Sequence, residues 1–216
     1  MIRNDVIMMA LPRWDSLFHS TALSLSKEIS RTNRVFYIDN PFTLKEVVTG
    51  FMKKPVRQRL LALFFGINKY RRIDPSNENL IAVTPRFVLP VNFLPQGKIS
   101  SFLSSINNAI VSWAIRSAIK KYQIKDFIFI NSYNPFYLED ADKFKPVCTI
   151  YHCVDNISES KYISRHGSRL EQKMIRDFDL TLSTSRKLSQ YAQQFSKNTF
   201  YLPNGADFKL FRCAFD

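Results

Sequence analysis

The feature of this sequence that most constrains its fold is a series of short, continuous apolar runs, each stopped by a proline or a polar side chain. These runs are residues 6–10, 35–38, 80–83, 127–130 and 147–151. Apolar runs of roughly four to eight residues are typical of strands buried on both faces, which occur mainly in parallel sheets. Segments with helical periodicity lie between them, so the sequence predicts an alternating α/β fold.

The remaining elements extend this pattern to the end of the chain. Longer helices are expected at residues 16–30, 99–122 and 169–177, and from a cap at 183–185 to residue 194, with further strands at 180–182 and 200–202. Asp15 or Ser16 is expected to cap the first helix. Residues 1–205 are therefore predicted to form one α/β, Rossmann-like domain, with a mostly parallel sheet and helices on both faces. Residues 206–216 are expected to begin a linker to a further domain.

Composition narrows the range of partners and compartments. The 216 residues include 31 Lys and Arg against 18 Asp and Glu, a net charge of +13, which favours an anionic partner such as nucleic acid, a bilayer surface or a phosphorylated substrate. Three cysteines without a Cys-x-x-Cys pair argue against a disulfide framework and a structural zinc site. No apolar run approaches the roughly 18 residues of a membrane span. We expect a cytoplasmic protein, peripheral on the inner face of the membrane.

Several familiar cofactor motifs are absent. The loop after the first apolar run has no Gly-x-Gly-x-x-Gly, and no Walker motif occurs. Asp39 stands where a ribose-binding acid would lie, but without the glycines it is better interpreted as a strand-end cap. Asp177 and Asp179 form an Asp-x-Asp motif, a spacing that often arises by chance. We therefore predict no cofactor and no metal site.

The most specific motifs lie in the last third of the chain. They are Tyr-His-Cys-Val-Asp at residues 151–155, Asp-Phe-Asp-Leu-Thr-Leu-Ser-Thr-Ser at 177–185 after Glu171, and Leu-Pro-Asn-Gly-Ala-Asp at 202–207. In this order they resemble the acceptor-side, N-terminal domain of the family-4 glycosyltransferases, enzymes of the two-domain GT-B fold. The front of the chain is similar too, with Trp-Asp in the first loop, residues 34–41 and residues 80–85.

This resemblance implies a function. The chain would be the N-terminal half of a glycosyltransferase that moves a sugar from a nucleotide-sugar donor to a membrane-linked or polysaccharide acceptor in bacterial cell-envelope biosynthesis. Without its donor-binding half it would be inactive. One departure concerns the first loop, where many members of the family have a glycine pair near the nucleotide diphosphate and this chain has Pro12, Arg13 and Trp14.

The resemblance also suggests site residues, each of which has a structural alternative. His152 and Asp155 are the candidate catalytic residues, although His152 could bond loop backbone and Asp155 could form a turn. The candidate acceptor-binding residues are Trp14, Asp15, Ser16, Asn134, Ser185 and Arg186. Ser185 is also explained as a helix N-cap. Asn204 and Gly205 would form the interdomain turn beside the nucleotide, or a simple tight turn.

Residues 44–72 form a basic, apolar segment that is expected to contain two short helices. Its eight Lys and Arg side chains stand against one acid, Glu46, a local net charge of +7. A basic amphipathic segment with aromatic residues is typical of an interfacial helix. The predicted contacts with an anionic membrane are Lys53, Lys54, Arg57, Arg59, Phe64 and Phe65. A solvated helical face is the plain alternative, and no recognised module supports nucleic-acid binding. The rival function is a non-enzymatic basic domain that binds anionic membrane or nucleic acid.

Overall fold

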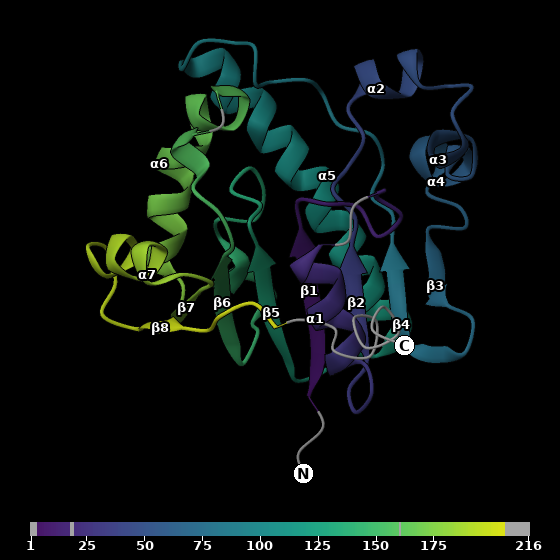
Figure 1. Ribbon diagram of the computed structural model, residues 1–216. Coiled ribbons are helices and arrows are strands. Elements are labelled where there is room, and N and C mark those ends of the chain that lie inside the picture. The colour runs from purple at the N-terminus through teal and green to yellow at the C-terminus, as the bar shows by residue number, and fades with distance from the viewer. Residues whose placement is uncertain (1–3, 18–19, 160, 206–216) are drawn as a thin grey trace, which may run out of the picture.

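The computed structural model describes residues 4–17, 20–159 and 161–205, which form an α/β domain built on one twisted sheet (Figure 1). The strands are β1 (Asp5–Ala10), β2 (Val35–Ile38), β3 (Tyr70–Asp74), β4 (Asn77–Val83), β5 (Phe127–Ser132), β6 (Cys148–Cys153), β7 (Leu180–Ser183) and β8 (Thr199–Tyr201). The helices are α1 (Thr21–Ile29), α2 (Leu44–Thr49), α3 (Lys54–Arg57), α4 (Leu60–Phe65), α5 (Lys98–Tyr122), α6 (Lys161–Asp177) and α7 (Arg186–Gln193), with 3-10 turns at Ala141–Phe144 and Ile157–Glu159.

The strand order in the sheet is β3-β4-β2-β1-β5-β6-β7-β8. All neighbouring strands are parallel except β3, which pairs antiparallel with β4 at the edge. The direction of strand addition reverses between β1 and β5, because the connection through α5 crosses back over the sheet. The predicted Rossmann-like, mostly parallel α/β fold is confirmed, and this reversal is the kind of switch point at which such sheets bind ligands.

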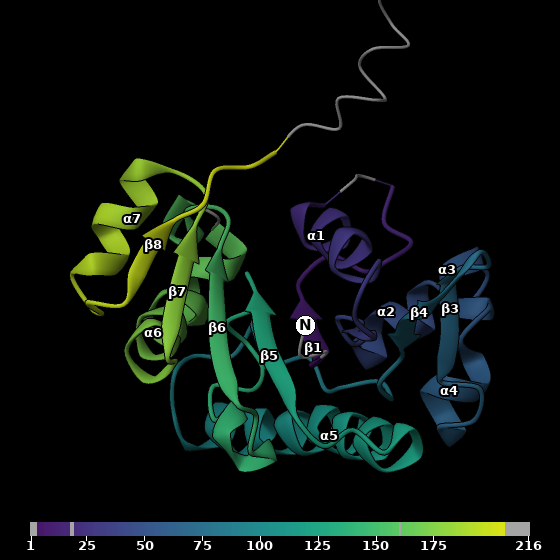
Figure 2. The same ribbon diagram turned by 90° about the horizontal axis from the view of Figure 1, so that it is seen from below.

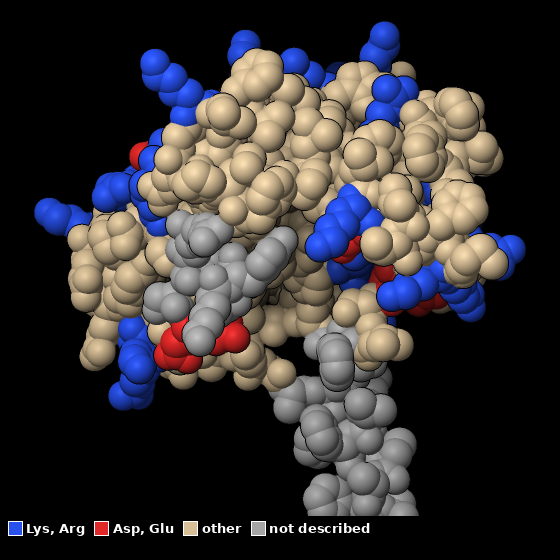
Figure 3. All heavy atoms as spheres, turned by 90° about the horizontal axis from the view of Figure 1, so that it is seen from above, with Lys and Arg blue, Asp and Glu red and all other residues tan. Residues whose placement is uncertain are grey.

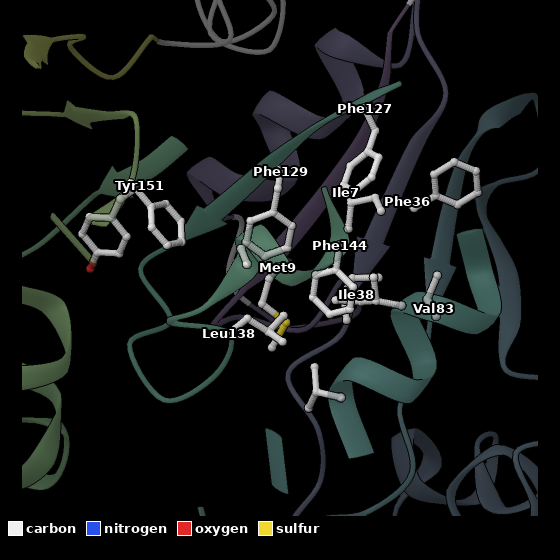
Figure 4. Packing of buried hydrophobic residues seen from close by; sticks show 14 of the residues in the cluster. Ile7, Met9, Phe36, Ile38, Val83, Phe127, Phe129, Leu138, Phe144 and Tyr151 are labelled. Carbon is white, nitrogen blue, oxygen red and sulfur yellow. The ribbon is translucent and has the colours of Figure 1, made fainter. Parts of the chain in front are cut away.

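Helices cover both faces of the sheet. On one face, Ala22 and Leu23 of α1 pack against Met8 and Tyr37. Helices α5, α6 and α7 contribute to a larger core on the opposite face, and Figure 2 shows α1 and α5 on opposite sides of the strands. Side chains from neighbouring strands converge in this larger core (Figure 4): Ile7, Met9, Phe36, Ile38 and Phe129. Burial on both faces explains why the strands are continuous apolar runs.

Helix α1 begins later than the sequence suggested. Its N-cap is Ser20, whose side chain accepts a hydrogen bond from the backbone N–H of Leu23 over 3.2 Å. The predicted caps, Asp15 and Ser16, therefore lie before the helix. The carboxylate of Asp15 forms an ion pair, and Ser16 is exposed. Leu17, which lies inside the predicted helix 16–30, precedes α1 and is 97% exposed.

The segment 44–72 contains three short helices rather than the expected two, and it continues into the unpredicted edge strand β3. Thr43 and Glu46 form a capping box at the start of α2. Gly66 ends α4 with φ +69°, and an added Cβ would lie 2.9 Å from the Trp113 ring, so both backbone and space favour glycine. Strand β3 escaped prediction because its exposed Arg71 and Arg72 break the apolar pattern, which is common at sheet edges.

The second aspartate of the Asp-x-Asp motif, Asp179, has a structural role. Asp179 Oδ2 accepts hydrogen bonds from the backbone N–H and the hydroxyl of Thr149, over 2.7 and 2.9 Å. This carboxylate lies just before β7, at the opposite end of the sheet from the loops that follow β1 and β5. In the part of the chain that the structure describes, no group of His, Cys, Asp and Glu side chains is arranged to hold a metal ion.

The described cysteines and helices add two observations. Cys153 is buried and Cys148 is half-buried, and both are free thiols, whereas Cys213 lies outside the described residues. Among the described helices, none combines the length and apolar character that a membrane crossing requires.

Candidate functional site

The loops that follow β1, β2, β5, β6 and β7 lie at one end of the sheet, which we call the carboxyl edge. Figure 3 views the molecule from this side, where Lys and Arg side chains lie mostly around the rim of a broad uncharged area. Three groups of residues occur at or near the edge: a buried ion-pair network around Arg59, the switch-point loops around Asn134 and His152, and a large cleft beside α5.

The first group is built around Asp39 at the end of β2, whose side chain is buried. Its carboxylate accepts hydrogen bonds from the backbone N–H of Trp14 at 3.2 Å, from Arg59 at 3.3 Å and from the Thr84 hydroxyl at 3.4 Å. Arg59 Nη1 also donates to Asp15 Oδ2 over 2.8 Å. Asp39 is thus a strand-end cap, as interpreted from the sequence, and the network joins segment 44–72 to the loops after β1 and β2.

This network corrects one membrane prediction. The Arg59 side chain is only 4% exposed and its guanidinium lies 5.2 Å from the centre of the Trp14 ring, so it does not reach a membrane surface. Burial alone would lower the pKa of Arg59, but its bonds to Asp15 and Asp39 raise it. Burial raises the pKa of Asp39 to about 6, an effect that the charge of Arg59 opposes.

Asn134 holds the switch-point loops together from inside. Its Nδ2 donates to the carbonyl of Ala10 and to Asn40 Oδ1, both over 3.2 Å, and its backbone N–H donates to Asn131 Oδ1 over 3.0 Å. The residue is fully buried. Tyr133, just before it, has a positive φ of 55°, a strained conformation for a non-glycine residue. Asn134 therefore supports the loops after β1, β2 and β5 instead of presenting an amide to the surface.

His152 lies at the end of β6, opposite Ser132 of β5. Its Nδ1 is 3.0 Å from the Ser132 hydroxyl and the residue is 2% exposed. Burial lowers the pKa of His152 to about 4, so the imidazole is neutral at pH 7 and a weak base. The sequence did not single out Ser132, although it follows Asn131 at the end of the same strand.

Asp155 has different surroundings from His152. It is exposed, and its Oδ1 accepts a hydrogen bond from the backbone N–H of Asn156 over 2.8 Å. The structural alternative for Asp155, a turn former, describes this contact. The two predicted catalytic residues thus lie close in sequence but in separate environments, one buried and one exposed.

The other predicted residues are spread along the edge. Ser185 caps α7, because its hydroxyl accepts from the backbone N–H of Leu188 over 3.2 Å. Arg186 is exposed in the first turn of α7, Ser16 is exposed in the loop after β1, and Asn204 and Gly205 are exposed after β8. Their roles in acceptor binding and in an interdomain turn remain predictions.

A cleft of about 1220 Å³ lies beside α5, and we call it the α5 cleft. Leu11 and Asn40, from the loops after β1 and β2, border it. Its lining combines hydroxyl and amide side chains with apolar and aromatic ones, including Thr43, Ser101, Ser104, Ser105, Asn108, Ser112, Leu89, Phe93, Trp113, Phe136 and Tyr137. None of the predicted acceptor-binding residues is among the described lining residues.

The walls of the cleft are fixed by side-chain bonds from α5. Asn107 Oδ1 accepts from the backbone N–H of Leu89 and its Nδ2 donates to the Leu89 carbonyl, both over 2.8 Å. Asn108 Oδ1 accepts from the backbone N–H of Leu138 over 2.8 Å. The sequence signal for this site was the polar stripe of serines and asparagines along α5, which a search of strand ends alone overlooks.

Comparison with known proteins extends these observations. No protein-family model matches the sequence, and no curated protein matches it. Among solved structures, a sucrose-phosphate synthase from Thermosynechococcus elongatus superimposes with a TM-score of 0.53 and 10% sequence identity, over 99% of this chain and 100% of that chain. At this identity the likeness shows the fold, and it supports a GT-B-like arrangement of the sheet and helices.

Proposed function

We propose that this chain is the acceptor-side half of a glycosyltransferase, which takes a sugar from a nucleotide-sugar donor and passes it to a membrane-linked or polysaccharide acceptor of the cell envelope. The observation that carries the proposal is the α5 cleft at the carboxyl edge of a GT-B-like domain. Sugars present many hydroxyls, and the Ser and Asn side chains of the lining are donors and acceptors for them. The name of the structural neighbour, a sucrose-phosphate synthase, is consistent with chemistry on sugars.

In this proposal the chain positions the acceptor and the donor-binding half lies outside these 216 residues. Holding the two substrates together lowers the barrier by removing translational and rotational freedom. The leaving diphosphate is stabilised by fixed charges and dipoles of the closed site. The Arg59 network and Asn134 keep the edge loops in place for this purpose.

His152 and Asp155 take different parts in the proposal. A buried imidazole whose pKa lies near 4 is a poor proton acceptor at neutral pH, so His152 is assigned to positioning. Asp155, exposed at the carboxyl edge, is the candidate to orient the acceptor hydroxyl.

We also propose that the exposed part of segment 44–72 docks on anionic membrane. Lys53, Lys54 and Arg57 are exposed, and Phe64 and Phe65 are 42% and 65% exposed. A second group of exposed apolar side chains occurs around the start of α5: Phe93, Ile99 and Phe102, at 65%, 72% and 65%. Clusters of exposed apolar side chains mark interaction sites, and the exposed cations of segment 44–72 favour anionic lipid.

The glycosyltransferase proposal is tested by ligand binding to the 216-residue chain. In NMR titrations, maltose as a neutral glycan probe should perturb amide signals of α5 and of the loop at residues 89–97. UDP-glucose should bind no tighter than roughly millimolar, a free energy of about -4 kcal/mol. Micromolar UDP-glucose binding, or glycan signals confined to other parts of the chain, would contradict the domain assignment. Tight, salt-sensitive binding of DNA would instead favour the rival basic binding domain.

A further inference from the structure

The acidic side chains that line the α5 cleft are all neutralised within the protein. Each one forms an ion pair with a basic side chain among the described residues. The pairs are Glu46 with Arg13 at 3.0 Å, Glu139 with Lys173 at 3.4 Å, and Asp140 with Lys143 at 2.9 Å. These carboxylates therefore contribute little net negative field to the cleft.

Basic side chains of the lining are not neutralised in the same way. Lys45, Arg116 and Arg169 are exposed, and none has an ion pair within the part of the chain that the structure describes. The remaining basic lining residue outside the pairs, His166, has its Nε2 3.0 Å from the Leu94 carbonyl. The cleft thus has an excess of unpaired positive charge.

Two of these cations border the same short loop. The Arg116 guanidinium lies 5.8 Å from the centre of the Phe144 ring, at the end of the loop that follows β5. Arg169 precedes Lys173 by one turn of α6, and Lys173 contacts Glu139 of that loop. Arg116 on α5 and Arg169 on α6 both line the cleft, together with residues 135–137, 139–140 and 143 of this loop.

A buried hydroxyl of the lining lies one helical turn from Arg116. Ser112 lines the cleft and is 5% exposed, and its Oγ has no hydrogen-bond partner among the described residues. It precedes Arg116 by four residues on α5, so the two side chains are neighbours on one helix face. A buried polar atom without a partner is unfavourable, which points to a ligand atom that supplies the missing bond.

We propose that Ser112, Arg116 and Arg169 form a subsite for an anionic group on a saccharide. The group is a phosphate ester, as in a lipid-linked sugar, or the carboxylate of an acidic sugar unit. A guanidinium binds either oxyanion through two parallel N–H donors, and the Ser112 hydroxyl adds a further bond. The inference rests on the proposed function in one respect, since it takes the ligand of the α5 cleft to be the acceptor saccharide.

The test compares binding of four probes to the 216-residue chain by NMR titration: methyl glucoside, glucose 1-phosphate, glucuronic acid and inorganic phosphate. Glucose 1-phosphate, glucuronic acid or both should bind about tenfold tighter than methyl glucoside, the size expected from one charge-assisted bond. The two acidic sugars distinguish the phosphate source from the carboxylate source. Equal binding of all three sugars would overturn the subsite. So would inorganic phosphate binding as tightly as both acidic sugars, because that shows no use of the saccharide.

Variants locate the subsite. Arg116→Ala and Arg169→Ala should each reduce the affinity for the preferred acidic sugar about tenfold and leave methyl glucoside unaffected. Lys120→Ala, an exposed position one turn further along α5, is the matched control and should change neither. Ser112→Ala should weaken binding without lowering the melting temperature, because its hydroxyl makes no internal bond. Equal losses in the arginine variants and in Lys120→Ala would contradict the subsite. Methyl glucoside binding at α5 would still support the proposed function in that case.

Discussion

Nη1 of Arg59 lies 2.8 Å from Oδ2 of Asp15, an ion pair across 44 residues of sequence that ties segment 44–72 to the loop after β1. The same loop is held by the Tyr37 hydroxyl, which donates to the Pro12 carbonyl over 2.6 Å. The backbone N–H of Trp14 is engaged by Asp39. The loop after β1 is thus held in place by side-chain hydrogen bonds and an ion pair.

Removal of the Arg59 guanidinium should be strongly destabilising. Arg59→Met removes the ion-pair partner of Asp15 and of the buried Asp39, and breaking a buried pair in this way costs about 3–5 kcal/mol. Arg57→Met, two residues earlier and exposed, is the control and should change the free energy of unfolding by less than about 0.5 kcal/mol. Urea denaturation measures both. Similar small effects for the two variants would show that the network contributes little.

Much of the fold could be predicted because the strands are apolar runs buried on both faces. This signal located β1, β2, β5 and β6 to within one or two residues, as β2 shows at Val35–Ile38, but it missed the first three residues of β4, which begins at Asn77. Elements and boundaries that lack this signal were missed or misplaced. The edge strand β3 carries exposed arginines, and the start of α1 is set by Ser20, which has no distinctive sequence context.

The site was less predictable because its contacts join distant parts of the chain. Arg59 was predicted to be a membrane contact of a basic segment, and nothing local in the sequence indicates its pairing with Asp39. The α5 cleft arises where α2, α5 and α6 meet the loops after β1, β2, β4 and β5, a juxtaposition created by the crossover from β4 to β5. Residue types at strand ends pointed to the carboxyl edge of the sheet, but they could not distinguish buried supports such as Asn134 from surface groups.

A buried glutamate should make stability depend on pH. Glu171 is 2% exposed, and its carboxylate accepts hydrogen bonds from the hydroxyls of Tyr151 and Tyr191 over 2.8 and 3.3 Å. Burial raises the pKa of Glu171 above its ordinary value of 4.5. A raised carboxyl pKa means that the folded state holds its proton more tightly. The contribution of Glu171 to the free energy of unfolding is therefore full below pH 4.5. It is lost as the pH rises through the pKa of Glu171 in the folded protein.

Glu171→Gln keeps the shape and the ability to accept from Tyr151 but removes the titration. The variant should be as stable as the natural protein at pH 4 and more stable at pH 7. Urea denaturation of both proteins across this range gives the difference in free energy of unfolding at each pH. This difference isolates the effect of Glu171 from that of Asp39, whose pKa is also raised. A difference that does not change with pH would contradict the assignment.

His152 should give a pH dependence of opposite sign. Burial lowers its pKa from 6.5 to about 4, so the unfolded chain takes up a proton before the folded protein does. The contribution of His152 to the free energy of unfolding is therefore full above pH 6.5, and it falls by roughly 3 kcal/mol as the pH drops to 4. His152→Asn should lack this loss. An imidazole NMR titration that gives a pKa near 6.5 in the folded protein would refute the buried, neutral state.

The membrane proposal predicts charge-dependent binding to vesicles. Lys53, Lys54 and Arg57 should each contribute about 1 kcal/mol at an anionic surface, so the triple change to Glu should abolish most binding in liposome flotation. Phe64→Ser with Phe65→Ser should weaken binding as well, because these exposed rings lose their insertion into the interface. Salt should weaken the electrostatic part, since the screening length falls from about 10 Å at 0.1 M to about 3 Å at 1 M.

A matched charge change separates this surface from the overall positive charge of the protein. Lys120, Lys187 and Lys197 are exposed and lie outside segment 44–72, so their triple change to Glu alters net charge equally. If the segment docks as proposed, this control should retain most of the binding to vesicles of phosphatidylglycerol and phosphatidylcholine. Equal losses from both triple variants would mean that net charge alone attracts the protein. Binding that is the same on pure phosphatidylcholine, or absent from both vesicle types, would remove the membrane from the proposed function.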